Sequence, residues 1–266
     1  METRSANQAG GSRLRIDVTL PVYNEEKDLA GSCEKLAAYL TAHCPHDWRV
    51  VIADNASTDK TPEVGRSMAA RYPYIKYHRL EMKGRGRALT EAWLASDADI
   101  VSYMDIDLST DLKSFMPMID AIERGGCDVA IGTRFDRKSE VDRGLKREVL
   151  SRGFITLIKL FFPFSSFSDA QCGFKAVSRR AVKALVPLIK SKAWFFDTEL
   201  LILADHHGYK IRNVPVKWID DPDSRVKIVG TVLEHSLGVL RMRLTFLTGR
   251  ELDVFYPRQI KIRSIA

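Results

Sequence analysis

Short apolar segments alternate with amphipathic ones along the first 130 residues, and this alternation most constrains the fold. The apolar segments are typical of strands and cover residues 16–23, 48–53, 75–78, 100–105 and 129–132. The intervening segments have the spacing of helices and cover residues 27–43, 60–72, 84–96 and 112–124. Strands and helices in strict alternation predict an α/β fold with a mostly parallel sheet and helices on both faces.

The pattern changes in the second half of the chain. We expect a charged loop over 133–146 and a helix over 147–162, followed by renewed alternation over 173–178, 181–189, 196–206 and 209–216. A charged loop over 219–230 and a helix over 231–247 complete the prediction. The domain prediction is a disordered N-terminus at 1–14, one domain at 15–230, and an amphipathic helix with a basic tail at 231–266.

Charge is distributed unevenly. Residues 1–120 carry 15 Lys and Arg against 18 Asp and Glu, a net of −3, whereas residues 121–266 carry 26 against 16, a net of +10. The basic half suits phosphate groups, an acidic lipid surface or nucleic acid, and a solvated basic face fits equally well. Nucleic acid is disfavoured because no aromatic stacking platform is interleaved with the basic residues.

The cysteines and the lack of long apolar runs indicate the cellular compartment. None of the four cysteines form a Cys-x-x-Cys pair or have zinc spacing with histidine, so we expect free thiols. The polar start has no apolar signal-peptide core, and no uncharged run approaches the roughly 20 residues of a membrane span. We therefore expect a cytoplasmic protein.

Two carboxylates follow the buried-looking strand at 100–105. Asp105 and Asp107 are spaced i, i+2, so continued strand geometry would place both on one face at the carboxyl edge of the sheet. Ligands bind at that edge in open α/β sheets, and hard oxygen ligands suit Mg²⁺ or Mn²⁺ against a diphosphate. The alternative is a plain strand followed by a helix cap at Ser109 or Asp111.

Other strand ends carry polar groups to the same edge. The first strand ends in Pro21, Tyr23 and Glu25, which could grip a nucleoside by stacking and hydrogen bonding, and the second ends at Asp54. Acidic groups converging there would repel one another unless cations or ligands occupied the site. The run 83–87, Lys-Gly-Arg-Gly-Arg, opens a helix and favours anions, although it has neither Walker A spacing nor a third dinucleotide-binding glycine.

Taken together, these motifs resemble those of family 2 glycosyltransferases. These enzymes transfer sugars from nucleotide-sugars and have the GT-A fold, which is Rossmann-like. The carrying segments are 21–26 (Pro-Val-Tyr-Asn-Glu-Glu), 54–59, 83–86 and 105–107 (Asp-Ile-Asp). The later segments 168–175 (Ser-Asp-Ala-Gln-Cys-Gly-Phe-Lys) and 196–201 resemble the dolichyl-phosphate and polyprenyl-phosphate glucose and mannose synthases.

The resemblance implies a role for each matching residue. The resemblance implies that Asp105 and Asp107 bind a divalent metal, Mg²⁺ or Mn²⁺. The implied catalytic residues are Asp107, Arg134, Asp169 and Arg225. Substrate binding falls on Pro21, Tyr23, Glu25, Asp54, Lys83, Asp105, Arg147, Asp197, Glu199 and Lys227. The arginines would hold phosphate groups, whereas Asp169, Asp197 and Glu199 would position the sugar or loops.

The resemblance also implies an inverting transfer of a hexose, with UDP-glucose favoured, to a polyprenyl or dolichyl phosphate. The alternatives are a GDP-mannose-dependent synthase, a transferase acting on a soluble glycan or protein hydroxyl, and a silent nucleotide-sugar-binding protein. We expect the enzyme to be peripheral on the cytoplasmic face of a membrane, through the apolar segment 154–167 or the helix at 228–247, unless 154–167 is an ordinary core helix. A separate transmembrane partner, or a membrane region following this chain, would fit the same scheme.

Overall fold

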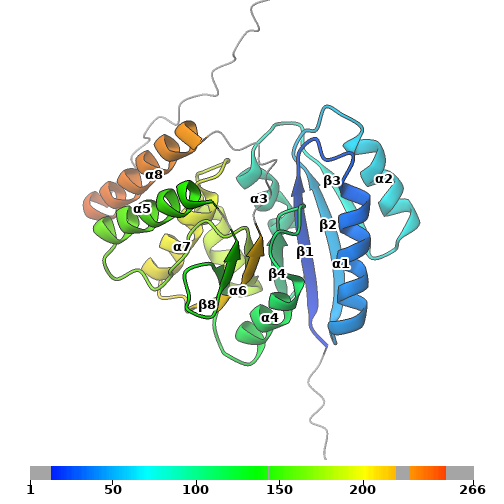
Figure 1. Cartoon of the computed structure of the whole chain (residues 1–266), viewed down its shortest axis with the longest axis horizontal. Helices are drawn as coiled ribbons and strands as arrows, with labels where there is room; N and C mark the ends of the chain where they lie inside the picture. The colour runs from blue at the N-terminus through cyan, green and yellow to red at the C-terminus, as the bar shows by residue number, and fades with distance from the viewer. Residues whose placement is uncertain (1–12, 143, 220–227, 250–266) are drawn as a thin grey trace, which may run out of the picture.

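The computed structural model describes residues 13–142, 144–219 and 228–249. A seven-stranded sheet with the order β3-β2-β1-β4-β7-β5-β8 has helices on both faces (Figure 1). Its strands are β1 (Arg15–Val22), β2 (Asp47–Asp54), β3 (Ile75–Arg79), β4 (Ile100–Met104), β5 (Val129–Thr133), β7 (Phe174–Ser178) and β8 (Ile211–Pro215). The α-helices are α1 (Leu29–His43), α2 (Thr61–Arg71), α3 (Arg85–Ala95), α4 (Phe115–Glu123), α5 (Leu145–Phe161), α6 (Arg179–Leu185), α7 (Phe196–His206) and α8 (Ile228–Thr248).

The direction of one strand determines where the second half of the chain meets the first. All neighbouring strands of this sheet pair in parallel except β7, which runs antiparallel to both β4 and β5. The predicted mostly parallel sheet with helices on both faces is therefore confirmed. Because β7 is reversed, its amino end lies at the edge where its parallel neighbours have their carboxyl ends, and residues 168–173 arrive there from a distant part of the sequence.

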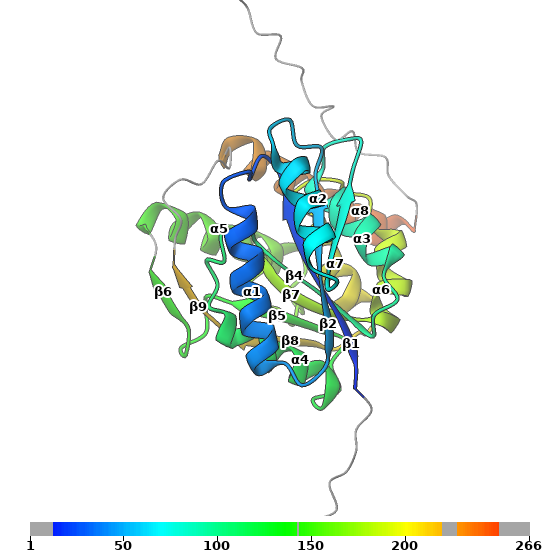
Figure 2. The same ribbon diagram turned by 90° about the vertical axis from the view of Figure 1, so that its right-hand side faces the viewer.

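Two apolar cores lie on opposite faces of the sheet because strand side chains alternate in direction. In β2, Val50 and Ile52 pack in the core beneath α1 and α4, whereas Val51 and Ala53 pack in the core beneath α3, α6 and α7. Figure 2 shows α1 in front of the strands, with α3, α6 and α7 grouped on another side. The strands are thus buried on both sides, which explains their nearly continuous apolar runs.

Sequence patterns did not indicate a second, two-stranded sheet. It pairs β6 (Glu140–Asp142) in parallel with β9 (Lys217–Ile219), inside and beside segments that we expected to be loops. The strands are three residues long, and Glu140 forms a 2.9 Å ion pair with Lys217 across them. Such short, charged strands have no apolar alternation to detect, since their stability depends on pairing between distant segments.

The C-terminal helix α8 is integrated into the packed body. It lies beside α5 (Figure 1) and also contacts α7, and its Val239 and Met242 are buried in the core beneath α7. Arg241 of α8 is also buried, with Nη2 2.5 Å from Glu199. Arg241 therefore does not contribute to an outward basic surface.

Candidate active site

Side chains from four parallel strands and one antiparallel strand meet at one edge of the sheet. Residues after the carboxyl ends of β1, β2, β4 and β5 lie there, and so does the turn before β7. The glycine at this turn is required sterically, because a Cβ on Gly173 would lie 1.8 Å from Oδ2 of Asp105. The backbone of one half of the chain therefore packs directly against a predicted metal ligand from the other.

The end of β1 forms the first part of the site. Pro21 pairs in register with Ala53 of β2, and Tyr23 follows the strand. The ammonium of Lys83 lies 3.2 Å from the centre of the Tyr23 ring. Glu25 lies in the turn that leads into α1, where its carbonyl accepts hydrogen bonds from the backbone N–H groups of residues 28 and 29. An aromatic ring and a basic residue are therefore in contact at this edge.

Asp54 is fully enclosed, and its charge is neutralised by the protein. Its carboxylate accepts hydrogen bonds from the Ser57 backbone N–H at 2.9 Å, the Tyr77 hydroxyl at 2.5 Å and Arg79 Nη1 at 3.0 Å. Burial and the hydrogen bond to Asp54 raise the pKa of Tyr77 to about 12, so the phenol stays protonated and donates. Our expectation of repulsion between unpaired acids does not apply here, because Arg79 supplies the missing positive charge.

Asp105 and Asp107 lie beyond the strand rather than on it. β4 ends at Met104, and Leu108 has a positive φ of 50°, so the two aspartates belong to a turn. The strand-alternation reason for placing them on one face is therefore wrong. Oδ1 of Asp107 accepts from the Ser109 backbone N–H at 2.9 Å, and Asp107 is exposed. The Asp105 side chain is 41% exposed and is paired with Arg85.

A buried charge network extends inward from Asp105. Arg85 donates through Nη2 to Asp105 at 2.5 Å and through Nη1 to Asp197 at 2.8 Å. Lys175, which is fully buried, lies 2.9 Å from the same Asp197, and the Tyr103 hydroxyl also donates to it. Burial alone would raise the pKa of Asp197, but the charges of Lys175 and Arg85 outweigh burial and hold that pKa below its usual value.

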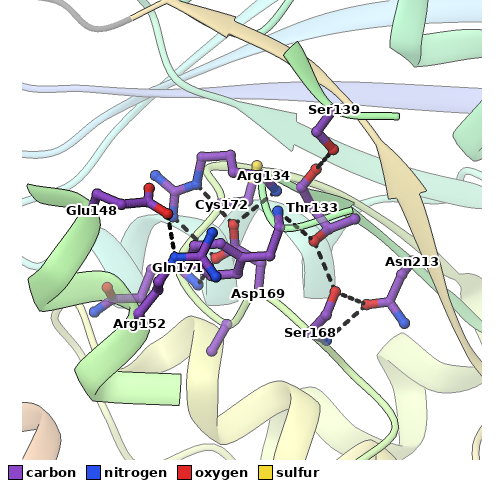
Figure 3. A network of polar contacts seen from close by, with 12 residues as sticks. Thr133, Arg134, Ser139, Glu148, Arg152, Ser168, Asp169, Gln171, Cys172 and Asn213 are labelled. Carbon is purple, nitrogen blue, oxygen red and sulfur yellow. Dashed lines mark hydrogen bonds and ion pairs between the residues drawn. The ribbon is translucent and has the colours of Figure 1, made fainter. Parts of the chain in front are cut away.

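A second network surrounds Arg134 at the end of β5 (Figure 3). Arg134 donates through Nε at 2.8 Å and Nη2 at 3.0 Å to the two carboxylate oxygens of Asp169, whose side chain is 2% exposed. The backbone N–H groups of Arg134 and Gln171 donate to the same carboxylate. Burial pushes the pKa of Asp169 upward, but the Arg134 guanidinium and these hydrogen bonds hold it below its usual value.

Four other predicted residues are placed elsewhere or not described. Glu199 is buried and accepts hydrogen bonds from Arg241 and from the Ser191 backbone N–H at 2.8 Å, so it fixes the loop before α7 to α8. Arg147 belongs to α5, and its side chain is not described. Arg225 and Lys227 lie outside the described residues. Their predicted roles stay predictions.

The donor set at this edge fits a divalent cation bound together with a diphosphate. Asp105 and Asp107 offer carboxylate oxygens, the ligand type that Mg²⁺ and Mn²⁺ prefer. Across the described ranges no group of three His, Cys, Asp or Glu could hold a metal ion by itself. Two carboxylates leave coordination positions open, and Mg²⁺ sites commonly fill such positions with phosphate oxygens and water.

Sequence reasoning overlooked the residues that organise these carboxylates. We treated Arg85 as part of an anion-binding helix start, yet its guanidinium pairs with two aspartates and lies 5.0 Å from the ring of Trp194. Lys175 was quoted in a motif without a role. A lysine in an otherwise apolar strand was the available signal, because a buried lysine requires a carboxylate partner.

The fold is the GT-A glycosyltransferase fold. The crystal structure of glucosyl-3-phosphoglycerate synthase from Mycobacterium tuberculosis in complex with Mn²⁺, UDP and phosphoglyceric acid superposes with a TM-score of 0.65 at 20% identity, covering 86% of this chain and 78% of that one. Its complex with Mn²⁺ and UDP-glucose gives a TM-score of 0.62 at 21% identity, over 89% of this chain and 79% of that one.

Sequence comparison identifies the family. The model of glycosyl transferase family 2 matches residues 17–186, so the chain belongs to glycosyltransferase family 2 and is a glycosyltransferase. Glycosyltransferase AglD of Haloferax volcanii is 34% identical over 235 residues, 88% of this chain but only 38% of that protein. The dolichyl-phosphate beta-glucosyltransferase of Saccharomyces cerevisiae is 26% identical over 253 residues, 88% of this chain and 75% of that protein.

Proposed function

We propose that this protein transfers a hexose, with UDP-glucose as the favoured donor, to a polyprenyl or dolichyl phosphate at the cytoplasmic face of a membrane. The relatives named dolichyl-phosphate beta-glucosyltransferase support the acceptor and the sugar. GDP-mannose is the alternative donor. The reaction is a single displacement with inversion. An acceptor phosphate oxygen attacks the anomeric carbon, and the bond from that carbon to the nucleoside diphosphate breaks, its electron pair leaving with the diphosphate oxygen.

The proposal rests on the ionisation and ion pairing of two aspartates, one in each buried network. Asp169 and Asp197 are both buried, bound by cations and held at lowered pKa, which makes them poor proton acceptors near neutral pH. A sugar or protein hydroxyl would need a base, whereas a phosphate monoester is already ionised. The site therefore favours a phosphate acceptor over the soluble hydroxyl that the sequence left open.

Arg134 is prepared for an anionic group by its pairing with Asp169. The described hydrogen bonds of its guanidinium use Nε and Nη2, and none of them uses Nη1. The guanidinium carbon of Arg134 also lies 5.3 Å from the centre of the Trp218 ring, and this contact limits the movement of the guanidinium. We infer that Asp169 orients Arg134 and that Nη1 meets a phosphate oxygen, since a fixed guanidinium loses little freedom on binding.

A divalent metal belongs to the proposal through Asp105 and Asp107. When bound there, Mg²⁺ or Mn²⁺ would neutralise the charge of the departing diphosphate. The protein's own contribution is to hold Asp105 against Arg85 and to keep Asp107 at the exposed turn. Tyr23 and Lys83, which are in contact with each other, would meet the base or the diphosphate of the donor.

A donor screen tests the proposed reaction. UDP-glucose, GDP-mannose and UDP-N-acetylglucosamine, each labelled in the sugar, are offered with a short polyprenyl phosphate and Mn²⁺ or Mg²⁺. We expect label in the organic phase from UDP-glucose, loss of transfer with EDTA, and a product whose anomeric configuration is opposite to that of the donor. Transfer only to soluble hydroxyl acceptors, or a product with retained configuration, would refute the proposal.

A membrane-facing surface is proposed on α5 and α8, which lie side by side (Figure 1). Leu160 of α5 is 77% exposed and Leu233 of α8 is 55% exposed, Phe164 in the turn after α5 is 96% exposed, and Lys159 adds positive charge. Part of the expected segment 154–167 is core instead, because Ile158 and Phe167 are buried. No helix in the described ranges is long and apolar enough to cross a membrane.

Vesicle flotation tests this surface. We expect binding to anionic vesicles at low salt, and clear loss of binding in the double variant Leu160→Ser/Phe164→Ser. Leu188→Ser is the matched control, because Leu188 is 46% exposed on a different helical segment. Equal flotation of the wild-type protein and the double variant would contradict the assignment of the surface.

A further inference from the structure

Arg85 occupies an enclosed position behind the predicted metal ligands. It is the first residue of α3 and is 9% exposed. Its guanidinium carbon lies 4.9 Å from the centre of the Tyr103 ring and 5.0 Å from that of Trp194, so the cation contacts two aromatic rings. Both rings limit contact with water, and low hydration strengthens the interaction of this charge with its neighbours.

The charges in this network are balanced without any added ion. Arg85 and Lys175 supply two positive charges, whereas Asp105 and Asp197 supply two negative charges. Asp105 is the only one of these four groups whose side chain is substantially exposed, at 41%. A metal ion approaching Asp105 therefore meets a carboxylate whose charge is already compensated from behind.

Arg85 is also held so that it stays in place when Asp105 binds something else. Its second bond, from Nη1 to Asp197 at 2.8 Å, and the two rings would remain if Asp105 turned toward a metal ion. The positive charge would then stay close to the bound cation and oppose it. The diphosphate of a donor would bring negative charge to the same place and remove that opposition.

We propose that Arg85 is an internal counter-ion that competes with the divalent cation for Asp105, so that tight metal binding requires the nucleoside diphosphate. This inference rests on the metal site of the proposed function. It makes Arg85 a positioning residue that couples two ligands: UDP strengthens the binding of metal, and metal strengthens the binding of UDP by the same factor.

Binding titrations test the coupling without turnover. Mn²⁺ is titrated into the full chain with and without saturating UDP, for wild type, Arg85→Gln, Arg85→Lys and the control Arg180→Gln. Arg180 is also an ion-paired arginine, 2.6 Å from Asp128, but Asp128 precedes β5 at the opposite edge of the sheet. Thermal unfolding of each variant confirms that it is folded.

Without UDP, we expect Arg85→Gln to bind Mn²⁺ about tenfold more tightly than wild type, corresponding to about 1.4 kcal/mol. With UDP the difference should shrink to about twofold, since the negative diphosphate already offsets the opposing charge of Arg85 in the wild-type protein. Arg85→Lys keeps the charge and should stay within about threefold of wild type, as should Arg180→Gln.

The outcomes separate this inference from the proposed function. Unchanged or weaker Mn²⁺ binding by folded Arg85→Gln would overturn the competition, because Arg85 would then only support the shape of the site. If wild type bound no Mn²⁺ even with saturating UDP but Arg85→Gln did, the competition would stand and the metal-dependent function would fail. If neither protein bound Mn²⁺ with or without UDP, both ideas would be refuted.

Discussion

The contact between Gly173 and Asp105 gives a sharp prediction about activity. In Gly173→Ala the new Cβ would lie 1.8 Å from Oδ2 of Asp105, whereas ordinary contacts begin at 3.4 Å, so the carboxylate must retreat by about 1.6 Å. The retreat is easy because the Asp105 side chain is 41% exposed. A displacement of this size at a reacting site costs about 10²-fold in rate, and we expect that loss in kcat/KM.

Stability should respond very differently from activity. The Asp105–Arg85 pair is partly exposed, so its distortion should change the free energy of unfolding by less than about 1 kcal/mol. Gly31→Ala is the matched control, because Gly31 lies in α1 and, apart from the adjacent residues and backbone of that helix, no atom lies within 4 Å of the new Cβ. That variant should keep full activity and gain about 0.5 kcal/mol of stability.

The assay combines initial rates of hexose transfer with urea unfolding of the same preparations. Activity of Gly173→Ala within threefold of wild type would refute the reasoning, because Asp105 would then tolerate a shift that the geometry says is damaging. Loss of activity together with several kcal/mol of stability would also contradict it, since the damage would then lie in the fold.

Three further changes probe the buried networks. Lys175→Met should lower the free energy of unfolding by about 3 kcal/mol, measured in urea, because Asp197 loses a buried partner. Asp169→Asn should raise the KM for the lipid phosphate more than it changes the KM for the nucleotide-sugar, because Arg134 loses its orientation; equal changes would contradict this. Burial lowers the pKa of His235 to about 4, so this residue binds fewer protons folded than unfolded. The free energy of unfolding therefore falls by about 3 kcal/mol in total as the pH drops from about 6.5 to about 4, because the unfolded chain binds a proton on His235 that the folded chain does not. Urea titrations should show that loss in wild type, and a shallower one in His235→Gln.

Most of the fold follows from local patterns. The strands β1, β2 and β5 were predictable because apolar runs of the right length end in polar groups or Gly, and their helices because apolar residues recur at helical spacing. The position and direction of β7 were not predictable, since strand pairing is decided by packing between distant segments. The same holds for β6 and β9, which have too few apolar residues to show a period.

Individual site residues were easier to predict than their partners. Asp105, Asp107 and Tyr23 follow strands, and their position at the sheet edge could be deduced from the parallel topology. That Asp105 faces Arg85, and that Asp169 faces Arg134, depends on contacts across 20 and 35 residues. Charge complementarity predicts that such pairs exist, but it cannot choose among the 41 basic residues of the sequence.

The reversed strand β7 also sets a distance. It lies between β4, which precedes Asp105, and β5, which precedes Arg134. Two steps between neighbouring strands of about 4.8 Å each put these strand ends about 10 Å apart. That gap is on the scale of one sugar ring between two phosphates. In the proposed reaction, β7 would therefore set the separation between Asp105 on the donor side and Arg134 on the acceptor side.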